Sequence, residues 1–400
     1  MTENDPYLTY CLKRDTDNQF RQLHETQTLP DGYASLGGEK LLNFASNDYL
    51  GLSQHPLLIN RAQEFTEKFG AGSTASRLIS GNAPAYGKIE EQLARGKGYE
   101  TALVMSSGYQ ANVTALAALA DADVIGKPVT VLADRLCHNS LLQGVLLSGA
   151  RLMRYQHNDY DHLENLLRAA SEKDAHILIV SESVFGMDGD CGDLGVLGEL
   201  KQRYGAMLYI DEAHATGVFG PDGFGFCAAH KGVVDVAMGT FGKALGSFGA
   251  YIACSQTIRD YLIQRCGGLI YSTALPPAVL GAIDAALELL PQMQNERSFL
   301  KMQSARLRLA LKGQGWDCGA SVTQIVPVIL GDEEAATTLA GNLCEEGFYA
   351  PAIRPPTVPR GTSRLRFSLS AVHKTAAIDR LITSMAVQAP LFAAPQALAS

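Results

Sequence analysis

The sequence predicts an α/β protein with a mostly parallel, seven-stranded sheet and a smaller C-terminal α+β domain. From about Glu100 onward, short apolar runs alternate with segments of helical length. The runs are apolar at nearly every position, which is typical of parallel strands covered by helices on both faces. After Pro277, a long helical segment is followed by shorter strands around another helix, which indicates the second domain.

Seven apolar runs are the candidate strands of the large sheet. They are Thr101–Ser107, Val129–Asp134, Arg151–Tyr155, His176–Ser183, Ala206–Ala213, Val233–Thr240 and Ala250–Cys254. Between them lie stretches such as DHLENLLRAASE, whose apolar residues recur at helical spacing. The alternation therefore predicts strand–helix–strand units.

The remaining segments set the expected domain bounds. In the C-terminal part, strands at Ile325–Leu330 and Leu365–Leu369 flank a helix around Ala335–Glu346. We expect an N-terminal arm that packs across the body, a large domain, a small domain and a loose tail. Their bounds are residues 1–48, 49–285, 286–390 and 391–400.

Composition excludes several classes of protein. The chain has 33 basic and 41 acidic residues, a net charge of −8, which argues against a general nucleic-acid binder. No run reaches the roughly 18 consecutive apolar residues of a membrane span, and the polar N-terminus lacks the apolar core of a signal peptide. The eight cysteines form no C-x-x-C pair, so we expect reduced thiols, no metal site and a cytoplasmic protein.

Polar residues follow five of the candidate strands. These residues are Ser106–Gly108, Asp134–His138, Glu182, Asp211–His214 and Thr240–Lys243. Ligands of open parallel sheets bind at the carboxyl ends of the strands, so the sequence predicts a site along this edge.

Lys243 stands in the motif TFGKALGSFGA, among several glycines. A lone lysine after a strand is usually a solvated surface charge. Here the small neighbours leave room for a ligand against the backbone, and partial withdrawal from water lowers the basicity of the amine, as a Schiff-base lysine requires. Thr240, three residues earlier, offers a hydroxyl to a phosphate.

Asp211 and His214 stand in the motif YIDEAHATGVFG. The pair is commonly a helix N-cap with a neighbouring histidine. A metal site is a second alternative, but a third ligand at suitable spacing is missing. In a site for pyridoxal 5′-phosphate (PLP), the aspartate keeps the pyridine nitrogen protonated and the histidine bonds the phenolic oxygen.

Three further residues join this set. The motif SSGYQAN opens a helix beside Gly108, where backbone N–H groups form an anion pocket suited to a phosphate. His138 follows a strand, either as an ordinary loop histidine or stacked flat on a pyridine ring. Arg354 lies in the proline-stiffened loop AIRPPTVPRGT, either as a surface arginine in a turn or as a clamp for a carboxylate.

Together these residues resemble the α-oxoamine synthases, PLP enzymes with the fold type I (aspartate-aminotransferase-like) architecture. The resemblance runs from NFASNDYLGL to RLRFSLS and includes GSTASRLISGN, ESVFGMDGD, DEAHATGVFG, TFGKALG, YSTALPP and PPTVPRGT. It implies that Lys243 forms a Schiff base with PLP and moves the Cα proton of the substrate. It also implies that Asp211 pairs with the ring nitrogen, His214 bonds the phenolic oxygen and His138 stacks on the ring.

The resemblance also assigns the remaining site residues. It implies that the phosphate meets Gly108, Tyr109 and Thr240. It implies further that Ser272 and Thr273 reach the cofactor of a neighbouring subunit, in a homodimer. The substrate residues that it implies are Asn47 and Arg354 for the amino-acid carboxylate, Glu182 near the substrate and cofactor, and Thr357 near the thioester.

The loop AIRPPTVPRGT most resembles the biotin-pathway members of the family, which condense L-alanine with a pimeloyl thioester, from CoA or a carrier protein. Arg21 is the residue placed to meet the far carboxylate of the pimeloyl chain. The chain departs from the family at Gly186, where a serine is more common.

Three alternatives remain open at this point. The first is another α-oxoamine synthase that uses glycine or serine with a different acyl-CoA. The second is a non-catalytic PLP-fold protein, although such proteins tend to lose the lysine or the aspartate retained here as Lys243 and Asp211. The third, a dinucleotide-binding dehydrogenase, lacks a G-x-G-x-x-G that opens a helix after the first strand.

Overall fold

The computed structural model describes residues 5–392 of the chain, which divide into two compact units. The larger unit comprises Asp48–Gly186 and Cys191–Ser298. The smaller unit holds the residues up to Asn47, Met187–Asp190 and the chain from Phe299 onward. The expected N-terminal arm thus belongs to the same unit as the C-terminal part, and the second boundary lies at residue 298 rather than 285.

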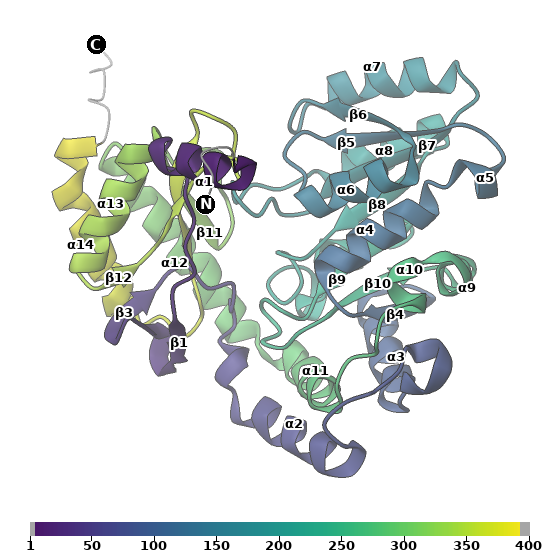
Figure 1. Ribbon diagram of the computed structural model, residues 1–400, viewed down its shortest axis with the longest axis horizontal. Coiled ribbons are helices and arrows are strands. Elements are labelled where there is room, and N and C mark those ends of the chain that lie inside the picture. Colours follow the sequence, from purple (N-terminus) through teal and green to yellow (C-terminus); the bar gives the residue numbers. More distant parts are fainter. Residues whose placement is uncertain (1–4, 393–400) are drawn as a thin grey trace. The chain divides into compact units, whose positions relative to one another are not determined.

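The larger unit contains a seven-stranded sheet in the order β4-β10-β9-β8-β7-β5-β6 (Figure 1). The strands are β4 (Thr101–Met105), β5 (Val129–Asp134), β6 (Arg151–Tyr155), β7 (His176–Glu182), β8 (Met207–Asp211), β9 (Val236–Thr240) and β10 (Ala250–Cys254). Strand β10 runs antiparallel to both β4 and β9, and the other pairs are parallel. All seven expected strands are present, with ends that differ by up to three residues.

Helices cover both faces of this sheet because its strands are apolar on both faces. On β5, Val131 packs in a core with Leu116 of α4 and Leu141 of α6, and its neighbour Leu132 packs in a second core with Leu163 of α7. Helices α4 and α6 lie side by side in Figure 1. The helices of this unit are α2 (Pro56–Phe69), α3 (Ala85–Lys97), α4 (Gly108–Leu119), α5 (Ala122–Ile125), α6 (Asn139–Ser148), α7 (Tyr160–Ser171), α8 (Leu194–Tyr204), α9 (Gln256–Arg265), α10 (Gly267–Ile270) and α11 (Pro277–Leu289).

The smaller unit is α+β and contains two small sheets. One has the order β1-β2-β3-β12, and the other β11-β14-β13. The strands are β1 (Thr26–Leu29), β2 (Tyr33–Leu36), β3 (Glu39–Asn43), β11 (Ile325–Gly331), β12 (Phe348–Tyr349), β13 (Ala352–Ile353) and β14 (Ser363–Ser368). The helices are α1 (Pro6–Thr16), α13 (Glu333–Glu345) and α14 (Thr375–Phe392), and α12 (Gln294–Gly313) enters from the larger unit.

The expected tail, residues 391–400, lies largely outside the described residues. Its first two residues end helix α14. Within residues 5–392, no helix is both long and apolar enough to cross a membrane.

Candidate active site

The predicted polar residues lie at the carboxyl ends of the parallel strands in the larger unit. Asp134 ends β5, Glu182 ends β7, Asp211 ends β8 and Thr240 ends β9. All four side chains are buried, although they are polar. Such burial is stable only with hydrogen-bond partners, and these partners define the site.

The Asp211 carboxylate is held from two sides. Its Oδ1 accepts a hydrogen bond from the backbone N–H of Ala213 at 2.7 Å, and its Oδ2 accepts one from Nδ2 of Asn112 at 2.8 Å. Asn112 also donates to Ser140 Oγ at 2.9 Å and accepts from the Tyr209 hydroxyl at 2.8 Å. These contacts fix the orientation of the carboxylate.

His138 lies beside this network and is held through both its side chain and its backbone. Its Nδ1 lies 2.7 Å from Ser140 Oγ, and its backbone N–H donates to Glu182 Oε1 at 2.5 Å. Burial lowers the pKa of His138; the positive charge of Lys243 adds to this effect and Asp211 opposes it. Burial also raises the pKa of Glu182, with a further contribution from Asp211. A neutral imidazole with a flat apolar face suits stacking on an aromatic ring.

Lys243 contacts His214 directly. Nζ of Lys243 lies 2.6 Å from Nε2 of His214, and the other ring nitrogen, Nδ1, lies 2.7 Å from the hydroxyl of Tyr49. His214 is thereby fixed between an amine and a phenol. A Cβ placed on Gly186 would lie 2.4 Å from Nε2 of His214, so a side chain at position 186 is incompatible with this position of the imidazole.

A cradle for an anion is formed where α4 begins. Ser107 caps the helix, and Gly108 and Tyr109 are its first residues. The first N–H groups of a helix have no acceptor within it, so those of Gly108 and Tyr109 can donate to an anion. A Cβ on Gly108 would lie 4.0 Å from Oγ1 of Thr240, and the N–H of Gly242 donates to that same oxygen at 3.1 Å. The donors of two strand ends therefore meet at this point.

Ser272 and Thr273 follow helix α10. Oγ of Ser272 accepts from Nε2 of Gln110 at 2.5 Å, which places it beside the first turn of α4 in the same chain. Thr273 forms an isolated backbone bridge with Ser76.

The predicted substrate residues Asn47, Arg354, Thr357 and Arg21 lie in the smaller unit. Oδ1 of Asn47 accepts from Arg366 at 3.0 Å, whereas Arg354 donates to the backbone carbonyls of Asn18 and Phe20 at 2.5 and 3.3 Å. Arg21 donates to the hydroxyl of Thr357 at 2.9 Å. Arg354 and Thr357 thus face the N-terminal segment, and the guanidinium beside Asn47 is that of Arg366.

Sequence reasoning missed Asn112, Ser140, Tyr49 and Arg366. Asn112 is the last residue of the motif SSGYQAN and Ser140 follows His138 by two residues, but nothing local to either signals a polar network. Arg366 carried a usable signal, because a strand with arginine at alternate positions, RLR, places two charged side chains on one face. Arg364 and Arg366 are both buried in the structure.

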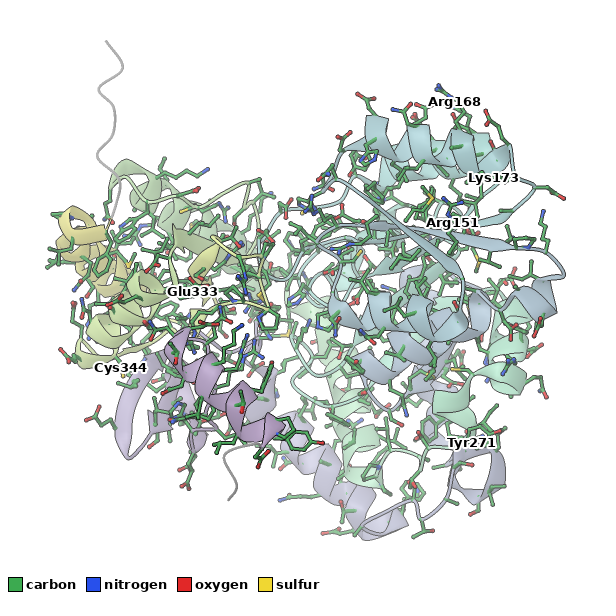
Figure 2. All side chains as sticks on the ribbon, turned by 45° about the horizontal axis from the view of Figure 1, so that its top comes forward. Arg151, Arg168, Lys173, Tyr271, Glu333 and Cys344 are labelled. Carbon is green, nitrogen blue, oxygen red and sulfur yellow. The ribbon has the colours of Figure 1, made fainter. Side chains whose placement is uncertain are left out.

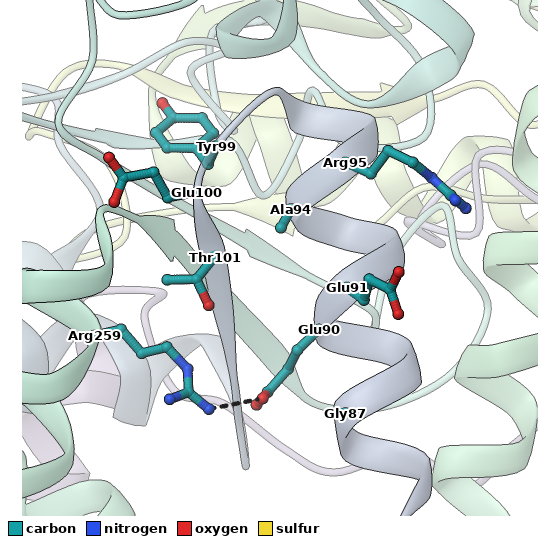
Figure 3. Close-up of a pocket in the computed structure, with 9 residues that line it drawn as sticks. All are labelled: Gly87, Glu90, Glu91, Ala94, Arg95, Tyr99, Glu100, Thr101 and Arg259. Atoms are coloured by element: carbon teal, nitrogen blue, oxygen red, sulfur yellow. Dashed lines mark hydrogen bonds and ion pairs between the residues drawn. The ribbon is translucent and has the colours of Figure 1, made fainter.

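A cavity of about 440 Å³ lies elsewhere in the larger unit, beside α3, β4 and α9 (Figure 3). Its wall includes Glu90, whose carboxylate pairs with Arg259 at 3.2 Å. No residue predicted for the site lines this cavity.

Comparisons with known proteins agree on one family. The profile described as Aminotransferase class I and II matches residues 39–385. A protein of Gluconacetobacter diazotrophicus named 8-amino-7-oxononanoate synthase is 49% identical and covers 96% of this chain and 97% of its own. A protein of Geobacter sulfurreducens with the same name is 46% identical and covers 87% of this chain and 89% of its own.

Solved structures of two enzymes also match over most of the chain. Serine palmitoyltransferase from S. paucimobilis, with a bound PLP–myriocin aldimine, matches with a TM-score of 0.90 and 28% identity, over 97% of both chains. An 8-amino-7-oxononanoate synthase from Francisella tularensis matches with a TM-score of 0.75 and 26% identity, over 88% of this chain and 98% of that one.

Proposed function

The chain belongs to the aminotransferase class I and II family, and from this premise we propose that it catalyses the reaction of its 8-amino-7-oxononanoate synthase relatives. It is an acyltransferase, and its cofactor is PLP. In the proposed reaction, L-alanine and a pimeloyl thioester give 8-amino-7-oxononanoate, the free thiol and carbon dioxide. The observation that carries the proposal is the contact of Lys243 with His214, three residues after the buried Asp211 that ends β8.

The side chains present at the strand ends fit PLP. Asp211 offers a carboxylate to a ring nitrogen, and Lys243 offers a primary amine to an aldehyde. Gly108, Tyr109 and Thr240 offer N–H and hydroxyl donors to a phosphate, and a Cβ built on Gly108 would lie at van der Waals distance from Thr240, 4.0 Å from its Oγ1, so these donors stand close together. His138 offers the face of its imidazole to the ring.

The chemistry divides between cofactor and protein. PLP, when bound, supplies an electron sink for the negative charge that develops at the Cα of the amino acid. Nζ of Lys243 takes the Cα proton and later returns one, and His214, at 2.6 Å, orients this amine. Nδ2 of Asn112 and the backbone N–H of Ala213 hold the Asp211 carboxylate in a fixed orientation. Between the two proton transfers, the Cα–acyl bond forms as the thioester C–S bond breaks, and the carboxyl carbon leaves as carbon dioxide.

Guanidinium groups bind carboxylates through strong, often bidentate hydrogen bonds, so arginines are the expected partners of the substrate carboxylates. We propose Arg366, together with Asn47, for the carboxylate of the amino acid, because both side chains already share a hydrogen bond at 3.0 Å. The role of Arg354 in holding that carboxylate stays a prediction. For the far carboxylate of the acyl chain we retain Arg21, whose partner is the hydroxyl of Thr357.

We propose that the active form is a homodimer. Ile79 and Tyr271 are 80% and 86% exposed (Tyr271 is labelled in Figure 2). They lie on two segments joined by the bridge between Ser76 and Thr273. The segment Arg77–Gly81 contacts helix α10, so two exposed apolar side chains stand on neighbouring segments, and an apolar surface shared by such segments is a candidate interface. The cytoplasmic location predicted from the sequence stays a prediction.

The test of the function is product formation by the purified protein with PLP. L-Alanine, glycine and L-serine would each be offered with pimeloyl-CoA, acetyl-CoA and palmitoyl-CoA, with thiol release and product mass as readouts. We expect turnover with alanine and pimeloyl-CoA to exceed every other combination. Preferred turnover of glycine or serine with another acyl-CoA would assign the chain to a different branch of the α-oxoamine synthases.

A further inference from the structure

A second charged pair lies directly behind the candidate site. Glu212, the residue after Asp211, and Lys97, the last residue of α3, both have side chains that are 0% exposed. Nζ of Lys97 lies 2.5 Å from Oε2 of Glu212. The proposed chemistry uses neither residue. Because removing two charges from water is costly, such a pair is a poor source of stability and needs another explanation.

The pair connects three separate segments of the larger unit. Lys97 also donates to the carbonyl oxygen of Phe224 at 2.7 Å, and Oε1 of Glu212 accepts from the N–H of Cys227 at 2.9 Å. Gly225 lies between these two contacts with φ of +92°, and a Cβ there would lie 2.7 Å from both carboxylate oxygens of Glu212. The loop of residues 224–227 is therefore closed around the carboxylate and tied to the end of α3.

The backbone of Glu212 carries this constraint into the site. Its carbonyl oxygen accepts from the N–H groups of Ala215 and Thr216 at 3.0 and 2.8 Å, which forms the turn that contains His214. Its own N–H donates to Met238 of β9 at 2.7 Å. With Glu212 held by Lys97, the residue before it, Asp211, contacts Asn112, and the residue two positions after it, His214, contacts Lys243.

We propose that Lys97 and Glu212 are positioning residues that set the turn between Asp211 and His214 and so hold both side chains in place for the cofactor. The inference rests on the proposed function only in that the cofactor is PLP. It predicts that a folded protein without the charge pair binds the cofactor differently from the wild type. If the pair were merely structural, its loss would lower the stability of the fold and leave cofactor binding by the folded protein unchanged.

The decisive variant is K97M/E212Q, which removes both charges together and leaves neither one buried without a partner. The control is Asp284→Asn, which removes another buried carboxylate of the larger unit, the one on α11 that pairs with Arg61 of α2 and with Lys88 of α3. Circular dichroism and thermal unfolding report the fold. Dissociation of PLP and the pH midpoint of its visible absorption band report the site.

For K97M/E212Q we expect the circular dichroism of the wild type and PLP affinity weakened by about tenfold, within the coupling typical of contacting residues. We also expect a displaced pH midpoint of the absorption band, and neither change in Asp284→Asn. A folded K97M/E212Q with wild-type affinity and midpoint would overturn the inference. If K97M/E212Q does not fold, the variant Glu212→Asp replaces it, because it keeps the charge but shortens the side chain. PLP dissociation and the pH midpoint of the absorption band would be measured on that variant, with the same expected changes. A wild-type protein that binds no PLP would instead overturn the proposed function.

Discussion

The imidazole of His214 lies between the hydroxyl of Tyr49 and the amine of Lys243, and it can do so only because residue 186 has no side chain. The departure from the family serine that the sequence revealed thus has a steric meaning in this chain. At the scale of single residues, the site depends on the absence of a side chain at position 186 as well as on its charged groups.

Replacing Gly186 with serine should displace His214 from Lys243. The new Cβ would lie 2.4 Å from Nε2, so the ring or the backbone must move. Overpacking of this kind costs about 1–3 kcal/mol of unfolding free energy, which urea denaturation would measure. Gly87→Ala is the control, because nothing lies within 4 Å of its Cβ. Equal stability of G186S and the wild type would show that the site accommodates a serine without strain.

Replacing Lys243 with alanine should abolish turnover and leave the fold intact. The lysine is only partly buried, so its loss leaves no large cavity, but the proposed mechanism assigns the transfer of the Cα proton to this amine. Thiol release from pimeloyl-CoA measures the activity, and circular dichroism measures the fold. Lys173→Ala, at an exposed lysine labelled in Figure 2, is the control. Near-normal turnover by K243A would contradict the proposed mechanism.

At the scale of elements, the sequence predicted the central sheet and, to within two residues, also β11, α13 and β14 of the smaller unit, but it predicted no strand in the N-terminal segment. The strands β5 and β7 are continuous apolar runs, so their pattern is visible without knowledge of their partners. Strand β1, TQTL, is largely exposed and polar, and β2 and β3, YASL and EKLLN, mix polar and apolar residues, so their pattern resembles that of a loop. The antiparallel direction of β10 has no local signal at all.

The same contrast holds for the site. Lys243 and Asp211 stand in recognisable motifs at strand ends, whereas Lys97 contacts Glu212 across 115 residues of chain. Asn112 and Asp211 are separated by 99 residues. Pairing over such separations depends on the tertiary fold, and periodicity within one segment carries no information about it.

His373 joins two elements of the smaller unit and should make its stability depend on pH. Its Nδ1 accepts from the N–H of Ser370 at 3.1 Å and its Nε2 lies 3.0 Å from the carbonyl oxygen of Asn43 at the end of β3, an arrangement that suits the neutral ring. Burial lowers the pKa of His373 to about 4.

In the unfolded chain this histidine titrates near its ordinary pKa, so below about pH 6.5 the unfolded state binds a proton that the folded state does not. Stability present at pH 7 is therefore lost as pH falls towards 4, by about 3 kcal/mol in total. Urea denaturation between pH 7 and pH 4 measures this loss. His373→Gln, which cannot titrate, should lack this component of the slope; identical slopes would contradict the prediction.

At the scale of the whole molecule, the proposed homodimer is open to a direct test. Ile79→Glu places a charge on the exposed apolar surface near Tyr271, so it should shift the protein towards the monomer and weaken PLP retention. Light scattering after size exclusion measures the mass. Leu147→Glu, at an exposed leucine of α6, is the control. A wild-type monomer with full activity would contradict the proposal.

The pairing of β3 with β12 joins Leu42 to Phe348, near opposite ends of the chain. A ribosome delivers the first of these strands long before the second, so β3 must wait, with its hydrogen-bonding edge unpaired, until nearly the whole polypeptide has emerged. During that interval the larger unit has all its residues and is free to fold. Strands β1, β2 and β3 can pair with one another as soon as they are made, but the outer edge of β3 is among the last to find its partner. Neighbouring nascent chains on one messenger RNA would each display the same unpaired edge, which makes this stage of synthesis the one most exposed to aggregation.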